Sequence, residues 1–283
     1  MEICNTLASL LPERTELVDV VLEYGMVSRM FEMVVASNLH ASGVVFEMAL
    51  VVLCVILRSP NPLHRSAVLS SRSTAAAQCY CYSKRLSTAA AAASESRCGA
   101  PHEATLLSYI VQYLSRGACV NAATAIDLVR GLSVIVEEEP LCLVDSAHIS
   151  IVADLLRGDS HDLKVEVGQF LCKLVLVPQV DPMMQQLGWL DAAAVLRLAS
   201  CWAAFLTTDD DPSLLFNSLR SLCLVFQYAV QQPGAAYSFD VLHCGQLKDH
   251  AASLAFHPVR EIAAAAAHLE DCILSYMHSS DDW

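Results

Sequence analysis

Six leucines lie within apolar segments at nearly regular intervals, and this periodicity limits the possible folds more than any other feature. Successive leucines are 46, 79, 39, 51 and 47 residues apart, so four of the five intervals lie near 40–50 residues. The six positions are Leu7, Leu53, Leu132, Leu171, Leu222 and Leu269. Leu53, Leu171 and Leu222 begin a Leu-Cys-x-apolar pattern. Regular intervals of this length are typical of chains built from stacked helical units.

Apolar residues recur at three- and four-residue spacing through nearly the whole chain, with little strand-like alternation. Residues 149–156 predict a short helix, 157–160 a polar turn, and 163–177 a long helix. The last copy of this module has a short helix over 244–255 and a long helix over 259–277. The sequence therefore predicts an all-α fold.

Asp211 precedes Pro212 at the start of another long apolar segment. We expect Asp211 to cap this helix, because an aspartate there accepts hydrogen bonds from free backbone N–H groups. Proline suits the first helical position, where its missing N–H is not needed.

A short helix, a sharp turn and a long helix in a period of about 42–47 residues resemble the armadillo repeat. The segment Leu155–Glu166 is similar to the turn between the second and third helices of that repeat. The resemblance covers roughly residues 1–57 and 104–278. It implies a right-handed α-solenoid of about five armadillo/HEAT-like repeats with one low-complexity insertion.

The resemblance also divides the chain. Residues 1–57 are expected to hold N-terminal repeats, the first incomplete, because Glu2–Leu11 matches the end of a long helix. An exposed apolar edge there would meet an upstream element or another chain. Residues 104–278 are expected to hold the remaining repeats, and 279–283 a polar tail.

Residues 58–103 form the predicted insertion. Nineteen of the 43 residues over 58–100 are Ala or Ser. Six are basic and one is acidic, so this stretch carries about +5 and the rest of the chain about −18. This composition favours a flexible loop. The alternative is a degenerate repeat, which the 79-residue interval permits.

The residue types in this insertion raise two questions, whether it carries a phosphorylation site and whether it binds zinc. Ser87 follows Lys84-Arg85 and is a candidate phosphorylation site. One set of residues could supply a Cys₃His zinc site, but Cys-x-Cys spacing is unusual for zinc and we expect no metal. That set is Cys79, Cys81, Cys98 and His102.

The net charge of −13 disfavours nucleic-acid binding, because an acidic surface repels phosphates.

The longest apolar run, Met48–Leu57, has ten residues, whereas a membrane-spanning helix needs about 20. Met1–Asn5 lacks the positive charge of a signal peptide. The twelve cysteines are scattered and mostly lie in apolar helical patterns, which is typical of buried free thiols in a reducing compartment. We expect a cytoplasmic protein without a membrane span, with the nucleus left open.

No motif indicates catalysis. The sequence contains neither a phosphate-binding glycine loop nor a Gly-x-Ser-x-Gly or His-Glu-x-x-His motif. His148 and His268 lie in helical patterns and were interpreted as packing or surface residues. We therefore expect a protein that is not an enzyme and that has no cofactor.

The resemblance implies a concave groove lined by the long helices. Residues two before and two after each buried leucine point away from it and share one helix face. On consecutive long helices these positions carry Arg130, Gln169, Lys173 and Arg220, which we expect to contact an acidic or extended peptide. The positions two after the leucines hold no asparagine and the positions two before them hold no tryptophan, unlike importin-alpha-like members, which argues against binding of nuclear-localisation signals.

Val51 and Val55 occupy the same positions beside Leu53. Met48–Leu57 is apolar all round, which predicts burial on every side. The cover was expected to be the insertion, a partner or a second copy of the chain.

These features favour a non-catalytic protein-interaction scaffold or adaptor, because solenoids usually bind partners along extended surfaces. The alternative is a structural or regulatory subunit of a larger complex, held through its exposed solenoid ends.

Overall fold

The structure is a computed structural model in which the described residues are helical or form short turns. No strand occurs among them, which confirms the predicted all-α class. The described residues are 2–11, 14, 16–40, 43–70, 106–116, 121–138, 146–176, 192–208, 211–231 and 241–280.

The chain forms two compact units, Met1–Ile135 and Val136–Trp283. Their boundary falls inside helix α7 (Ala122–Glu138), whereas the sequence had suggested a division at the insertion. Composition changes at the insertion, but contacts between helices decide where a compact unit ends.

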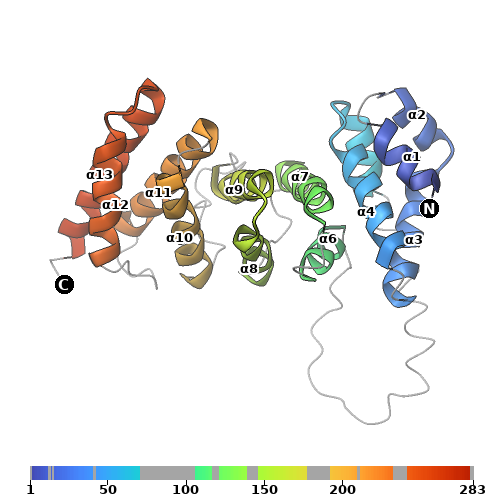
Figure 1. Cartoon of the computed structure of the whole chain (residues 1–283), viewed down its shortest axis with the longest axis horizontal. Coiled ribbons are helices and arrows are strands. Elements are labelled where there is room, and N and C mark those ends of the chain that lie inside the picture. Colours follow the sequence, from blue (N-terminus) through green and yellow to red (C-terminus); the bar gives the residue numbers. More distant parts are fainter. Residues whose placement is uncertain are drawn as a thin grey trace, which may run out of the picture. The chain divides into compact units, whose positions relative to one another are not determined.

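Unit 1 is built around helix α4 (Gly43–Leu57). Helices α1 (Glu2–Leu10), α3 (Met26–His40) and α6 (Leu106–Leu114) pack against α4, and α2 (Glu16–Glu23) packs on α3 (Figure 1). Every side chain from Ala49 to Leu57 is buried. The predicted burial on every side is therefore confirmed except at Met48, which is half-buried. The expectation about the cover was incomplete, because these helices of the chain itself contact α4.

Helix α7 also contacts α4 directly. Thr124 Oγ1 donates a hydrogen bond of 2.8 Å to Glu47, and Arg58 forms a 2.8 Å ion pair with Asp127. A Cβ placed on Gly131 would lie 2.8 Å from Cys54 Cβ, so the two helices approach closely at this point. Among the described residues between them, 58–70, 106–116 and 121, no other long helix occurs. The 79-residue interval therefore joins two neighbouring long helices.

The first part of the predicted insertion is folded. Residues 62–70 are helical, and Ser59, His64 and Val68 are buried. Asn61 caps this helix, because its Oδ1 accepts a 3.0 Å hydrogen bond from the backbone N–H of Leu63. The predicted flexible segment therefore started too early in the sequence. Residues 71–105 lie outside the described part of the chain.

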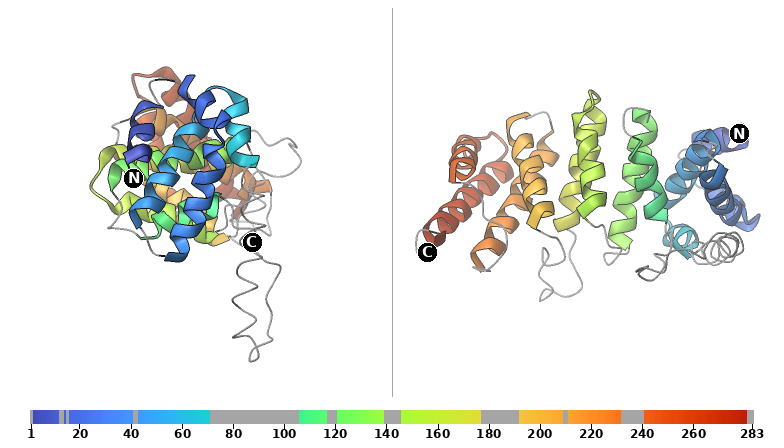
Figure 2. Two further views of the ribbon diagram at one scale, coloured as in Figure 1. Left: turned by 90° about the vertical axis from the view of Figure 1, so that its right-hand side faces the viewer. Right: turned by 90° about the horizontal axis from the view of Figure 1, so that it is seen from below.

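Unit 2 consists of helical pairs in two layers (Figure 2). The long helices of one layer are α9 (His161–Leu176), α11 (Pro212–Gln231) and α13 (Arg260–Ser280). The second layer holds α8 (Ser146–Asp154), the 3₁₀ turn η2 (Leu155–Arg157), α10 (Ala192–Thr208) and α12 (Val241–Leu254). Each helix packs on its partner across the layers and on the next helix within its own layer.

The helix boundaries in unit 2 follow the predicted module closely. Asp211 caps α11 as predicted, because its Oδ1 accepts hydrogen bonds of 2.8 and 2.9 Å from the N–H groups of Ser213 and Leu214. Helix α13 continues to Ser280, so the first two residues of the predicted polar tail are helical.

Among the described residues, Pro212–Val230 of α11 is long and apolar enough to cross a membrane, with a mean hydropathy of 1.2. However, 56% of this stretch is buried inside the protein, between the other helices of unit 2. A buried core helix passes the same test of length and composition.

Candidate functional site

The four predicted groove residues fall in different units. Arg130 is exposed on α7 in unit 1. Gln169 and Lys173 lie on α9 and Arg220 lies on α11, all in unit 2. The structure thus brings three of the four onto neighbouring long helices of one unit.

Two of these residues join neighbouring helices. Gln169 Oε1 accepts a 2.9 Å hydrogen bond from the amide of Asn217, so it links α9 to α11. Gln169 also donates to Ser213 over 3.4 Å. Lys173 forms a 2.7 Å ion pair with Glu137 at the end of α7. Both side chains therefore serve intramolecular contacts, and a contact with a partner stays a prediction.

Arg220 is exposed, and its guanidinium lies 5.6 Å from the centre of the Phe216 ring. A guanidinium over an aromatic face gains cation–π attraction and loses some conformational freedom. Arg220 is thus positioned on α11 one turn from Asn217, beside the Gln169–Asn217 contact.

A second polar contact joins the next two long helices. Gln227 of α11 lies 3.0 Å from His268 Nε2 of α13. The polar contacts of Asn217, Gln227 and His268 were not predicted from the sequence. Their only local signal is a polar residue in an otherwise apolar helix, which does not tell which neighbour it meets.

The repeated Leu-Cys pattern has a structural explanation. Each leucine is buried in the core of its unit, and each cysteine faces the next long helix. The partners are Gly131 for Cys54, Ser218 Oγ at 3.8 Å for Cys172, and the Ala265 carbonyl at 3.9 Å for Cys223.

Two of these thiols are expected to be unreactive at neutral pH. Burial raises the pKa of Cys54 to about 12 and that of Cys172 to about 11. A thiol with such a pKa stays protonated at neutral pH and is a poor nucleophile. Cys54 and Cys172 therefore act as small packing residues.

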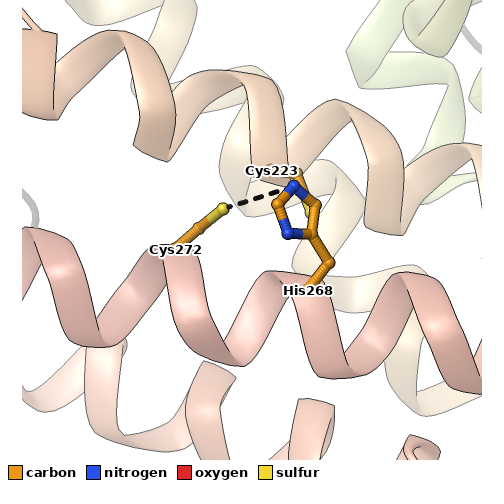
Figure 3. A group of neighbouring side chains, drawn as sticks. All are labelled: Cys223, His268 and Cys272. Atoms are coloured by element: carbon orange, nitrogen blue, oxygen red, sulfur yellow. Dashed lines mark hydrogen bonds between the residues drawn. The ribbon is translucent and has the colours of Figure 1, made fainter.

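Cys223 has different surroundings, because α13 presents both a thiol and an imidazole to it (Figure 3). Cys272 Sγ lies 3.9 Å from His268 Nε2, and the ligand atoms of Cys223, His268 and Cys272 all lie within 4.8 Å of one another. The two cysteines are buried, whereas His268 is exposed.

The close approach of the two thiols separates their acidities. The contact with Cys272 raises the pKa of Cys223, and burial raises it further. The same contact lowers the pKa of Cys272, and the adjacent His268 lowers it further. The interpretation of His268 as an ordinary packing or surface residue was therefore incomplete.

Unit 2 also contains a cavity of about 300 Å³. Its volume is at the lower end of the range for small-molecule sites. Most of its lining is apolar, and the Asp211 carboxylate already caps α11. Lining residues include Leu156, His161, Lys164, Phe205, Asp211 and Leu214.

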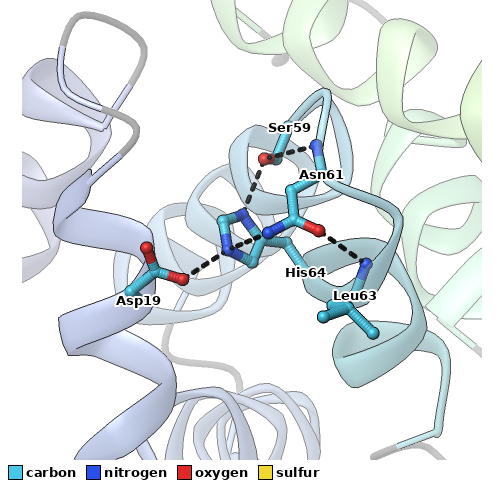
Figure 4. Close-up of polar contacts among 5 residues, drawn as sticks. All are labelled: Asp19, Ser59, Asn61, Leu63 and His64. Carbon is cyan, nitrogen blue, oxygen red and sulfur yellow. Dashed lines mark hydrogen bonds and ion pairs between the residues drawn. The ribbon is translucent and has the colours of Figure 1, made fainter.

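A serine, a histidine and an aspartate form a connected polar cluster in unit 1 (Figure 4). His64 Nδ1 lies 2.7 Å from Ser59 Oγ, and His64 Nε2 lies 2.7 Å from Asp19 Oδ1. The arrangement resembles a hydrolase triad in composition alone. The hydroxyl is buried and already accepts from the Asn61 N–H, whereas the carboxylate is exposed. A nucleophile must reach its substrate, so this cluster fits a structural link from α2 to helix 62–70.

The remaining predicted site residues lie outside the described part of the chain. They are the candidate phosphorylation site Ser87 and the residues weighed for zinc, Cys79, Cys81, Cys98 and His102.

Comparisons with known proteins give no family assignment. No family model and no curated protein matches this sequence. A crystal structure of an engineered protein, a Northeast Structural Genomics Consortium target, is similar with a TM-score of 0.57 and 13% sequence identity. The match covers 97% of this chain and 90% of that chain. At this identity, the likeness concerns the fold alone.

Proposed function

We propose that the chain is an α-solenoid of five armadillo/HEAT-like helical pairs. The pairs would be α3–α4, α6–α7, α8–α9, α10–α11 and α12–α13. The two-layer packing of unit 2 supports this assignment. Five of the six leucines that mark the period are also buried on the long helix of each pair, with at most 1% of their surface exposed, whereas Leu7 on α1 is only partly buried. The five are Leu53, Leu132, Leu171, Leu222 and Leu269.

The proposed function is a non-catalytic scaffold that binds an extended protein segment along α9, α11 and α13. The row of polar contacts on adjacent long helices carries this proposal, because Gln169–Asn217 and Gln227–His268 repeat across the layer. Side-chain amides both donate and accept, so they suit the backbone of an extended peptide. Arg220 adds a preference for acidic segments.

The proposed partner is a protein rather than a nucleic acid, because the net charge is −13. A reducing location, the cytoplasm or nucleus, fits the free thiols of the six cysteines whose side chains the structure describes.

The experiment measures binding of extended acidic, neutral and basic peptides to the purified full chain by fluorescence anisotropy. We expect the acidic series to bind best. Arg220→Glu should weaken it at least about fivefold, since a central interface arginine contributes more than about 1 kcal/mol. Arg157→Glu is the matched control, because Arg157 is exposed on the η2 turn in the other layer.

The double variant Arg130→Glu/Arg220→Glu tests whether Arg130, the predicted groove residue in unit 1, also contacts the peptide. A further loss of affinity would include Arg130 in the site. Equal binding of acidic and basic peptides, or equal effects of Arg220→Glu and Arg157→Glu, would contradict the proposed face.

One observation favours the alternative of a subunit held by its ends. Phe256, in the turn between α12 and α13, is 90% exposed, and Val259 beside it is 38% exposed. Exposed aromatic residues often anchor protein interfaces. A stable complex of fixed stoichiometry that dissociates on Phe256→Ser would support the subunit, whereas exchangeable partners would support the scaffold.

A further inference from the structure

The contact between α11 and α13 brings three soft metal ligands together. His268 and Cys272 are four residues apart on α13, so they lie on the same helix face. Cys223 reaches them from the neighbouring helix α11. Two thiols and an imidazole are the ligand types that zinc prefers.

The distances are close to those of a zinc site. Zn–S bonds are about 2.3 Å and Zn–N bonds about 2.0–2.1 Å, so tetrahedral ligands lie about 3.6–3.8 Å apart. Cys272 Sγ and His268 Nε2 are 3.9 Å apart, and every ligand pair lies within 4.8 Å. Side-chain movements of less than about 1 Å along the separations would complete the geometry.

The hydrogen bonds orient the histidine correctly. The amide nitrogen of Gln227 can only donate, so His268 Nε2 accepts this 3.0 Å hydrogen bond with its lone pair. The nitrogen nearest Cys272 is therefore the unprotonated one, as a metal ligand must be. An ion would replace this amide hydrogen bond, so the Gln227–His268 contact of the proposed binding face belongs to the zinc-free protein.

Burial and charge also suit a bound ion. Cys223 and Cys272 are only 5% and 7% exposed, whereas His268 is open to solvent and provides a route of entry. Two thiolates neutralise Zn²⁺, so the occupied site carries no net charge in a partly buried position. The other two cysteines of the Leu-Cys pattern do not meet a thiol and an imidazole in this way. Cys54 faces Gly131, and Cys172 faces Ser218.

We propose that Cys223, His268 and Cys272 bind one Zn²⁺ ion, with water in the fourth position. Binding displaces zinc-bound waters and releases the two thiol protons to solvent. The ion would fasten α13 to α11 and so stabilise the last helical pair. This proposal departs from the sequence-based expectation of no metal.

The test uses the purified full chain, kept reduced with a phosphine, and zinc alone as the probe. Competition with a chromogenic chelator gives the stoichiometry and affinity. Cys223→Ser, His268→Ala and Cys272→Ser should each lower the zinc affinity at least about 10–100-fold. Loss of a hydrogen-bond partner of a metal ligand already costs that much, and these residues are the ligands themselves. Cys172→Ser is the matched control for the cysteine variants, because Cys172 is also a buried thiol that follows one of the period-marking leucines. His250→Ala is the control for His268→Ala, because His250 is also an exposed histidine on a helix.

Thermal unfolding supplies a second readout. Zinc should raise the Tm of the unchanged chain and of both controls but not that of His268→Ala. His268 is exposed, so this variant keeps its fold without zinc. Equal zinc affinity in the unchanged chain and all three ligand variants would assign any bound ion to other residues and overturn the proposal. Absence of zinc binding by the unchanged chain would overturn it as well.

Discussion

Helices α4 and α11 carry the same repeated pattern but present different surfaces. Each has a fully buried leucine, Leu53 or Leu222, followed by a cysteine that faces the next long helix. Two positions before the leucine, however, α4 has the buried Val51 and α11 the exposed Arg220. One helix is therefore a core element of unit 1, whereas the other offers a polar face in unit 2.

The difference shows that a repeated core does not imply a repeated binding surface. Leu53 and Leu222 are each fully buried in the apolar core of their own unit, so both positions favour the same residue type. The opposite face of each helix is covered or open depending on its neighbours, and its residues differ accordingly. The candidate binding residues therefore lie where the neighbours leave a face open, in unit 2.

The largest expected effects test the similarity of the two helices. Leu53→Ala and Leu222→Ala should each lower the free energy of unfolding by about 2–5 kcal/mol, because each removes a fully buried side chain. Chemical denaturation measures the loss, and hydrogen exchange of α4 and α11 shows which unit is affected. Leu63→Ala is the control, because Leu63 is 74% exposed. A loss below about 1 kcal/mol at either anchor would break the equivalence.

An intermediate effect tests the difference between the two faces. Val51→Asn should cost about 2–4 kcal/mol, because it removes apolar burial and leaves a buried amide without partners. Arg220→Asn should change stability by less than about 0.5 kcal/mol, as exposed substitutions usually do. Both variants are compared by urea denaturation. Similar costs would show that the two faces are equally buried.

The smallest effects test how rigidly the long helices pack in each unit. A Cβ on Gly131 would lie 2.8 Å from Cys54 Cβ, which cannot move without its backbone. Gly131→Ala should therefore cost about 1–3 kcal/mol. A Cβ on Gly168 would lie 2.7 Å from a terminal carbon of Leu214 and 2.9 Å from the Phe205 ring.

Both neighbours of Gly168 line the cavity of about 300 Å³ and have room to shift. Gly168→Ala should therefore cost at most about 1 kcal/mol, partly offset by the higher helix propensity of alanine. Thermal unfolding of both variants gives the order. A larger loss for Gly168→Ala would contradict the difference in rigidity.

Local signals predicted helices and caps well. Asp211-Pro212 predicted the start of α11, and residues 149–177 predicted α8 and α9 with their turn. Asn61-Pro62 is the same kind of signal, and reading it would have placed helix 62–70 inside the composition-based insertion. Composition describes an average over many residues, whereas a cap depends on two or three.

The candidate sites were predicted less completely. Helical geometry placed Arg220 on an exposed face, but it gave no information about the partners of Gln169 and Lys173. His268 and Cys272 show ligand spacing within one helix, but Cys223 lies 45 residues before His268, and nothing local connects them.

The sequence by itself determined the all-α class, the positions of five of the six predicted buried leucines and most helix limits. These depend on spacing along one helix and on hydrogen bonds a few residues apart, which local sequence specifies. Only the tertiary structure decided that α7 packs on α4, which helices cover the apolar face of α4, and that three metal-ligand side chains meet between α11 and α13. These contacts join residues more than 40 positions apart, and the packing of whole helices determines which residues meet.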